Sequence, residues 1–261
     1  MVHFHPAELP GIAGGTGPEI AATLASQLAG TGIAFQGGAD AAAIAVHGNE
    51  VTVTTKDGSH HRANALLVAT GLRRRRLGVP GENELSGRGV SYSARLVREQ
   101  LKGADVVVVG GGDGAFENAW LLTEVGCRVT VLVRAQPSAR PEFRARAASD
   151  PSIRVLEGAT VVALEGDSRL ERVRISHEGR TLEVPVRGVV IKIGMTPNAE
   201  WCSGLERDRD GYVVADARGR TSRAQVWAAG DIARPLQPSI VVAAGSAATA
   251  MADLRAQLRG G

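Results

Sequence analysis

Cysteine and aromatic residues are scarce in this chain of 261 residues, and both shortages argue against particular functions. The two cysteines, Cys127 and Cys202, form neither a Cys-x-x-Cys pair nor a zinc-ligand pattern, so no metal site is expected. Cys127 is expected in the core, and for Cys202 a reactive thiol is the alternative to a buried one. Aromatic residues make up 3% of the chain, too few for the stacking platforms that bind single-stranded nucleic acid.

A large excess of one charge and a long apolar run are also missing. Thirty basic residues face 27 acidic ones, and the net charge of +3 is too balanced for a dedicated binder of polyanions. No apolar run reaches membrane-spanning length, and residues 1–28 lack the basic and apolar regions of a signal peptide. We therefore expect a cytoplasmic protein with no nucleic-acid partner and no membrane partner.

The most informative stretch is an apolar run that ends in glycines. Val106–Val109 is typical of a strand buried on both faces, residues 115–125 of a helix, and residues 128–133 of a second strand. In this context, Gly-x-Gly-x-x-Ala predicts a dinucleotide-binding turn, in which N–H groups at the helix N-terminus bind a pyrophosphate. The alternative is a tight strand–helix turn without a ligand. The six residues of the turn are Gly110, Gly111, Gly112, Asp113, Gly114 and Ala115.

The end of the second strand indicates which dinucleotide is bound. An NAD-specific site usually carries an acid there for the ribose 2′-hydroxyl. Here Val133 stands at that point, followed by Arg134 and, further along, by Arg140. Guanidinium groups without an acid favour the 2′-phosphate of NADP, so we predict NADPH rather than NADH. The alternative is a pair of solvated surface arginines.

The segments around this unit also show strand and helix patterns. Before it, residues 17–28 predict a helix, residues 42–46 and 50–55 a hairpin, and residues 65–71 a buried strand. After it, we expect short strands between residues 153 and 193, another strand at 226–231, and a helix from Val241 to about Leu258. The chain is long enough for one large or two modest domains.

Six motifs in register resemble the low-molecular-weight thioredoxin reductases and related flavoproteins with two dinucleotide-binding domains. The resemblance runs from about Pro10 to the C-terminus, and it indicates an FAD- and NAD(P)-dependent pyridine nucleotide-disulfide oxidoreductase. In chain order, the motifs are Ala69-Thr70-Gly71 with Gly78–Glu82, Gly87–Tyr92, Gly110–Ala115 with Glu117, Gly194–Asn198, Asp210–Val214 with Ala229-Gly230-Asp231, and Pro238–Gly245.

The resemblance implies an α/β protein with two Rossmann-like, three-layer dinucleotide-binding domains. An NAD(P)-binding domain at residues 103–224 would be inserted into an FAD-binding domain made of residues 1–102 and 225–261. In such proteins, the aspartate that matches Asp231 accepts a hydrogen bond from the flavin ribityl chain, and a helix N-cap is its alternative role. The other cofactor-binding positions that the resemblance implies are Thr70, Gly71, Gly194, Gly230, Ser239 and Ile240.

The first departure from the family lies at its redox centre. The family's Cys-x-x-Cys pair directly follows the tyrosine that matches Tyr92, and here Ser93 and Leu96 occupy the two cysteine positions. A serine hydroxyl forms no disulfide and does not ionise near neutral pH, so a dithiol relay to thioredoxin is excluded. No catalytic residue is therefore assigned, and electrons that leave the flavin must pass directly to a small molecule or a redox protein.

The second departure lies at the N-terminus. The family begins with a strand and a glycine finger for the ADP half of FAD, which need about 30 residues or more. Residues 11–17 are rich in glycine, but Pro6–Pro10 is unsuited to the buried strand before them. Three explanations stay open: a truncated gene model or fragment, a subunit completed by a partner, or a lineage that no longer holds FAD tightly. We expect FAD binding that is weakened or partner-dependent, and either a homodimer or a subunit completed by another chain.

The sequence thus favours a thioredoxin reductase-like flavoprotein oxidoreductase that passes hydride from NADPH to FAD and then electrons to a non-dithiol acceptor. Two alternatives stay open. One is a ferredoxin- or flavodoxin-type NADP reductase. The other is a non-enzymatic NADP(H)-binding or partner-completed subunit with an incomplete flavin site.

Overall fold

The computed structural model describes residues 16–260, and the chain divides into two compact units. Unit 1 contains the chain up to Arg73 and from Met195 onward, and unit 2 is the continuous segment Arg74–Gly194. Both boundaries differ from the expected positions at 102/103 and 224/225. Residues 6–15, where the sequence departs from the family's glycine finger for FAD, lie outside the described range.

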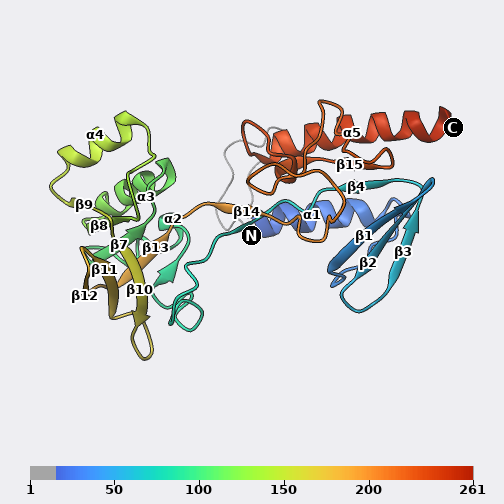
Figure 1. Cartoon of the computed structure of the whole chain (residues 1–261). Coiled ribbons are helices and arrows are strands. Elements are labelled where there is room, and N and C mark those ends of the chain that lie inside the picture. The colour runs from blue at the N-terminus through green and yellow to red at the C-terminus, as the bar shows by residue number, and fades with distance from the viewer. Residues whose placement is uncertain (1–15, 261) are drawn as a thin grey trace. The chain divides into compact units, whose positions relative to one another are not determined.

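Unit 2 is built around a wholly parallel sheet in the order β6-β13-β7-β8-β9 (Figure 1). In chain order, its strands are β6 (Val90–Ser91), β7 (Asp105–Val109), β8 (Arg128–Val133), β9 (Ile153–Glu157) and β13 (Gly188–Ile191). The helices of this unit are α2 (Ala94–Val97), α3 (Asp113–Thr123) and α4 (Pro141–Ser149). A separate antiparallel sheet contains β10 (Thr160–Glu165), β11 (Arg172–His177) and β12 (Arg180–Pro185).

The valines of β7 are buried on both faces of the parallel sheet, as predicted. Val106 and Val108 pack in a core cluster with α3, whereas Val107 and Val109 pack in a second cluster with the antiparallel sheet. This division follows from the alternation of side chains along a strand. Burial of each valine stabilises the unit by roughly 1.5–3 kcal/mol. The helices, the parallel sheet and the antiparallel sheet therefore form three layers.

Two segments account for the shifted boundaries. Val90 in β6 pairs with Val189 in β13, so the residues before β7 complete the sheet of unit 2. Cys202 packs in one core cluster with Val68 and Val226, so the segment after Gly194 belongs to unit 1. Neither the pairing nor the packing is local in sequence.

Unit 1 begins with α1 (Gly17–Ala29), which confirms the predicted helix. The N–H of Thr16 donates to the Glu19 carboxylate (2.6 Å), in a capping box that starts the helix. Its remaining elements are β1 (Ala41–His47), β2 (Glu50–Thr55), β3 (His60–Ala63), β4 (Leu66–Val68), β5 (Leu72–Arg74), β14 (Met195–Pro197), β15 (Val226–Ala228), η1 (Gly230–Ala233) and α5 (Ile240–Gly260).

The strands of unit 1 form small sheets. β1, β2 and β3 form an antiparallel sheet that contains the predicted hairpin, and β5 pairs with β14. β4 pairs in parallel with β15. Within residues 16–260, no other strand pairs with β4. Over the same range, no helix combines the length and the apolar character needed to cross a membrane.

Glu82 is a buried carboxylate that fixes the loop before β6. Its oxygens accept hydrogen bonds from the Tyr92 hydroxyl (2.7 Å) and from the N–H groups of Leu77 (3.2 Å) and Gly78 (2.8 Å). The Arg76 guanidinium lies 3.6 Å away. Burial raises the pKa of Glu82, but the hydrogen bonds and Arg76 outweigh burial, so the pKa lies below its ordinary value. Ionised Glu82 therefore stabilises the fold.

Glu82→Gln is expected to lower the free energy of unfolding by about 1–3 kcal/mol at pH 7, because a charged acceptor of three hydrogen bonds is lost. The stabilisation by Glu82 is fully present above its unfolded-state pKa and disappears as the pH falls through the lower folded-state pKa. Urea unfolding from pH 7 to pH 3 should therefore show the difference narrowing in acid. Glu84→Gln, which changes an exposed neighbour, is the control; an equal loss in both variants would contradict this role.

Candidate functional site

The turn after β7 approaches a neighbouring strand end so closely that its first position requires glycine. Gly110 has a φ of 143°, and a Cβ built there would lie 2.2 Å from the carbonyl oxygen of Lys192. That backbone is fixed, because the N–H of Lys192 donates to the carbonyl oxygen of Val109 (2.7 Å). The N–H of Gly110 donates to the carbonyl oxygen of Leu132 (3.0 Å). Gly110 thus lets the chain leave the sheet between β13 and β8.

The following residues open α3 with free N–H groups. The carbonyl oxygen of Gly112 accepts a hydrogen bond from the N–H of Ala115 (2.9 Å). The N–H groups of Gly112, Asp113 and Gly114 have no acceptor within residues 16–260. For a Cβ built at Gly112, the nearest atom would be the Ser138 hydroxyl oxygen, 3.8 Å away. Free N–H groups at the carboxyl ends of parallel strands, beside a position without a side chain, suit a phosphate.

Arg140, one of the two predicted arginines, joins the loop after β8 to this turn. The N–H and Nε of Arg140 donate to the two carboxylate oxygens of Asp113 (2.8 and 2.7 Å). These hydrogen bonds hold the pKa of Asp113 below its ordinary value. Arg134 is exposed and has no hydrogen bond or ion pair with another described residue. Arg134 is therefore the guanidinium that is free for an anion, whereas Arg140 positions Asp113.

The two predicted redox-centre positions lie at α2. Ser93 precedes this helix and Leu96 lies within it. The N–H of Ala94 donates to Oδ1 of Asn118 (2.8 Å), and Nδ2 of Asn118 donates to the carbonyl oxygen of Gly114 (2.6 Å). Buried Asn118 thus ties α2 to the first turn of α3. Sequence reasoning missed Asn118, although its four-residue spacing from Gly114 places both on one helix face.

Both cysteines of the chain are buried, so neither replaces the missing pair. Burial raises the pKa of Cys127, and it raises the pKa of Cys202 to about 11. The Cys127 thiol donates to the carbonyl oxygen of Leu101 (3.0 Å). A buried, protonated thiol is a poor nucleophile, so the structure does not support a reactive thiol at Cys202.

In unit 1, two predicted flavin positions hold a neighbouring loop. The Thr70 hydroxyl donates to the carbonyl oxygen of Asn198 (2.8 Å), and Nδ2 of Asn198 donates to the carbonyl oxygen of Thr70 (2.8 Å). The carbonyl oxygen of Gly71 accepts a hydrogen bond from the N–H of Asn198 (3.0 Å). The predicted position Gly194 instead belongs to unit 2, where its carbonyl oxygen accepts from the N–H of Arg75 (3.1 Å).

Asp231 lies in η1, directly after β15. Its half-buried carboxylate has no hydrogen bond or ion pair with another described residue. The residue that precedes η1 is Ala229, so Asp231 is not the N-cap that was its alternative role. The N–H of Gly230 donates to the hydroxyl of Ser246 on α5 (2.9 Å), which fixes η1 against that helix. An anchored carboxylate without a partner is suited to accept a hydrogen bond from a ligand hydroxyl.

The last two predicted positions lie at the start of α5. The Ser239 hydroxyl accepts a hydrogen bond from the N–H of Val242 (3.2 Å), so it caps the helix. Ile240, the first residue of α5, is 41% exposed.

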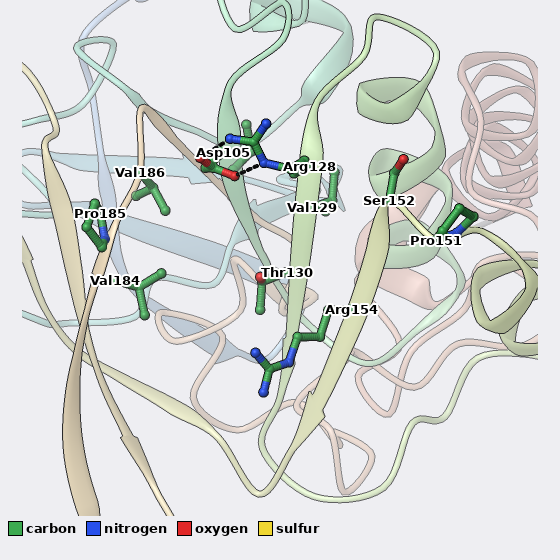
Figure 2. A pocket seen from close by; sticks show the side chains of 11 residues that line it. Asp105, Arg128, Val129, Thr130, Pro151, Ser152, Arg154, Val184, Pro185 and Val186 are labelled. Atoms are coloured by element: carbon green, nitrogen blue, oxygen red, sulfur yellow. Dashed lines mark hydrogen bonds and ion pairs between the residues drawn. The ribbon is translucent and has the colours of Figure 1, made fainter.

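A hollow in unit 2 lies at the opposite ends of the parallel strands (Figure 2). Asp105 and Arg128, at the starts of β7 and β8, border this hollow together with Arg154 and Pro185. Nε of Arg128 donates to Oδ1 of Asp105 (2.7 Å), so these two charges compensate each other. Open parallel sheets bind ligands at the carboxyl ends of their strands, so we do not assign this hollow to a dinucleotide.

Comparison with known proteins agrees with this arrangement. Residues 15–250 match the family model described as pyridine nucleotide-disulphide oxidoreductase. The chain belongs to this family. A thioredoxin reductase of Streptomyces coelicolor is 36% identical over 219 residues, which are 82% of this chain and 68% of that protein.

Solved structures of thioredoxin reductases are similar to this pyridine nucleotide-disulphide oxidoreductase along almost its whole length. The Lactococcus lactis structure has a TM-score of 0.72 at 28% identity and covers 96% of this chain and 84% of its own. The Streptococcus pyogenes structure has a TM-score of 0.70 at 30% identity and covers 99% of this chain and 85% of its own. The predicted thioredoxin reductase-like family and the predicted fold with two Rossmann-like domains are thus confirmed.

Gly112→Ala is expected to weaken NADPH binding at least about tenfold without lowering the melting temperature, because the methyl group lies beside the free N–H groups and makes only an ordinary contact with Ser138. Gly110→Ala is the matched change. Its methyl group meets the Lys192 carbonyl oxygen, so it should lower the melting temperature by roughly 2–10 °C. Calorimetric titration and thermal melts of both variants check this pair, and unchanged binding by Gly112→Ala would contradict the assigned site.

Proposed function

We propose that this protein is an oxidoreductase that takes hydride from NADPH and, through FAD, passes electrons to an acceptor without a protein dithiol. The turn Gly110–Ala115 carries the proposal, because α3 begins there with N–H groups that have no acceptor within residues 16–260, at the carboxyl end of β7. Family membership supports the flavin half of the proposal. The thioredoxin reductase names of the relatives support the direction of electron flow, from a nicotinamide cofactor to an acceptor.

Features of the turn and of the loop after β8 support NADPH as the electron donor. The free N–H groups of Asp113 and Gly114 suit the diphosphate. Arg134 directly follows β8, no carboxylate occupies the position of Val133, and an arginine in this part of a dinucleotide-binding fold suits a 2′-phosphate. Arg140 supports the site less directly, because its guanidinium already pairs with Asp113.

The residues of unit 1 fit a flavin through their hydrogen-bonding capacity. Asp231 offers an unpartnered carboxylate at the end of β15, held in place by the hydrogen bond of Gly230 to Ser246. When bound, FAD supplies the capacity to accept hydride from NADPH and to release electrons to a second acceptor. Asp231 would accept a hydrogen bond from the ribityl chain and thereby orient the ring system.

The terminal acceptor follows from the residues at α2. Ser93 and Leu96 carry no thiol, and both Cys127 and Cys202 are buried elsewhere. A protein disulfide therefore has no exchange partner on this chain. We propose that the acceptor is a small molecule or a redox protein that reacts with the reduced flavin directly.

The purified protein is expected to show a flavin absorption spectrum of about one equivalent per chain, either as isolated or after addition of FAD. Anaerobic NADPH should bleach this spectrum, and thioredoxin should not be reduced. Colourless protein that binds NADPH but takes up no FAD would contradict the enzyme and favour a nucleotide-binding module. Thioredoxin reduction at the rate of a dithiol enzyme would contradict the proposed acceptor.

Arg134→Ala is expected to lower kcat/KM for NADPH by about 10- to 100-fold and to leave kcat/KM for NADH unchanged, because one charge-assisted contact to the 2′-phosphate is lost. Steady-state kinetics of flavin reduction with both cofactors measures the two ratios. Arg144→Ala, which removes an exposed arginine of α4, is the control. A wild-type preference for NADH would overturn the choice of cofactor.

A further inference from the structure

Lys192 lies beside the dinucleotide turn. It directly follows β13, and its N–H donates to the carbonyl oxygen of Val109 (2.7 Å), so its backbone is fixed at the end of the parallel sheet. Its side chain runs toward the first turn of α3. Cε and Nζ lie 3.3 and 3.9 Å from the position that a Cβ on Gly114 would take. The half-buried ammonium group therefore lies beside the first turn of α3.

The charge on this side chain has no ion-pair partner among the described residues. Nζ of Lys192 makes no hydrogen bond or ion pair with any residue in the described range 16–260. Burial and the nearby Arg74 lower the pKa of Lys192, whereas Glu117 acts in the opposite direction without approaching to ion-pair distance. A half-buried cation without a partner is unfavourable. Such an arrangement is typical of a side chain that binds an anionic ligand.

Several sources of positive potential meet in this space. The N–H groups of Asp113 and Gly114 carry the partial positive charge of the α3 N-terminus. The Arg74 guanidinium lies over the ring of Tyr92, 5.5 Å from its centroid, and adds to the charge of Lys192. Free N–H groups beside an ammonium group without a partner among residues 16–260 suit an anion with several oxygen atoms.

We propose that Lys192 binds the diphosphate of the nicotinamide dinucleotide, in addition to the N–H groups of the glycine turn. This assignment rests on the function proposed above. Arg134 would hold the 2′-phosphate and Lys192 the diphosphate, so the two cations would recognise different parts of one ligand. The ammonium group would donate to diphosphate oxygens that also accept from the α3 N–H groups.

Three ligands separate these contacts. ADP carries a diphosphate and no 2′-phosphate, adenosine 2′-monophosphate carries a 2′-phosphate and no diphosphate, and NADPH carries both. Calorimetric titrations of the full chain would compare the wild type with Lys192→Met and Arg134→Ala. Methionine preserves much of the length and apolar volume of the lysine while removing its charge. Lys192→Arg restores a cation and should regain part of the lost affinity.

Lys192→Met is expected to raise the Kd values for ADP and NADPH by a similar factor of about 10- to 100-fold, and to change the Kd for adenosine 2′-monophosphate by less than about twofold. Arg134→Ala should raise the Kd for adenosine 2′-monophosphate and leave the Kd for ADP nearly unchanged. The melting temperature of Lys192→Met should not fall, because a half-buried charge without a partner among the described residues is removed. A purely structural lysine would lower the melting temperature and leave this ligand pattern unchanged.

Two results would overturn the assignment of Lys192. One is an unchanged Kd for ADP in Lys192→Met. The other is a loss of NADPH affinity without a loss of ADP affinity, which would place Lys192 at the nicotinamide nucleoside. Failure of the wild type to bind either NADPH or ADP is a different result, because it would overturn the proposed function itself and this assignment with it.

Discussion

The close approach between Gly110 and the carbonyl oxygen of Lys192 is the constraint on which the candidate site depends. A side chain at Gly110 would have to occupy the space of that oxygen, 2.2 Å away. Since none is present, the chain turns immediately after β7 and α3 begins three residues later. The same approach brings the Lys192 side chain beside the opening turn of the helix. One steric condition thus sets the turn, the direction of the free N–H groups and the place of the nearby cation.

Patterns that are local in sequence predicted the secondary structure around Gly110 well. The four valines before Gly110 and the glycine spacing predicted β7, the turn, α3 and β8, because each depends on residues a few positions apart. The two compact units have other bounds than the expected domains, because β6 is two residues long and pairs with β13, about a hundred residues further along the chain. Pattern alone offers no signal for such a short, distant pairing.

The roles of individual charged side chains were also beyond sequence reasoning. Arg134 and Arg140 look alike in the sequence, yet Asp113 engages only one of them. Lys192 follows an apolar strand, and only the structure shows that its side chain lies beside Gly114. These distinctions depend on tertiary neighbours, which the spacing of residue types does not reveal.

The segment that holds the two predicted redox-centre positions, Ser93 and Leu96, is fixed without a thiol. Asn118 holds the N–H of Ala94 and the carbonyl oxygen of Gly114 together, so α2 stays joined to the nucleotide-binding helix. This link is neutral and buried and does not depend on a sulfur atom. The segment thus keeps a structural use that is separate from dithiol chemistry.

The run Val106–Val109 has a consequence for how β7 finds its neighbours during folding. A slip of one residue usually exchanges apolar for polar side chains across a sheet, but here it exchanges valine for valine, so hydrophobic burial alone selects no alignment. The alignment is instead decided at the two ends of the strand. At one end Asp105 is paired with Arg128, and at the other only a residue without a side chain fits beside Lys192. Gly110 therefore also acts as a marker of correct strand alignment.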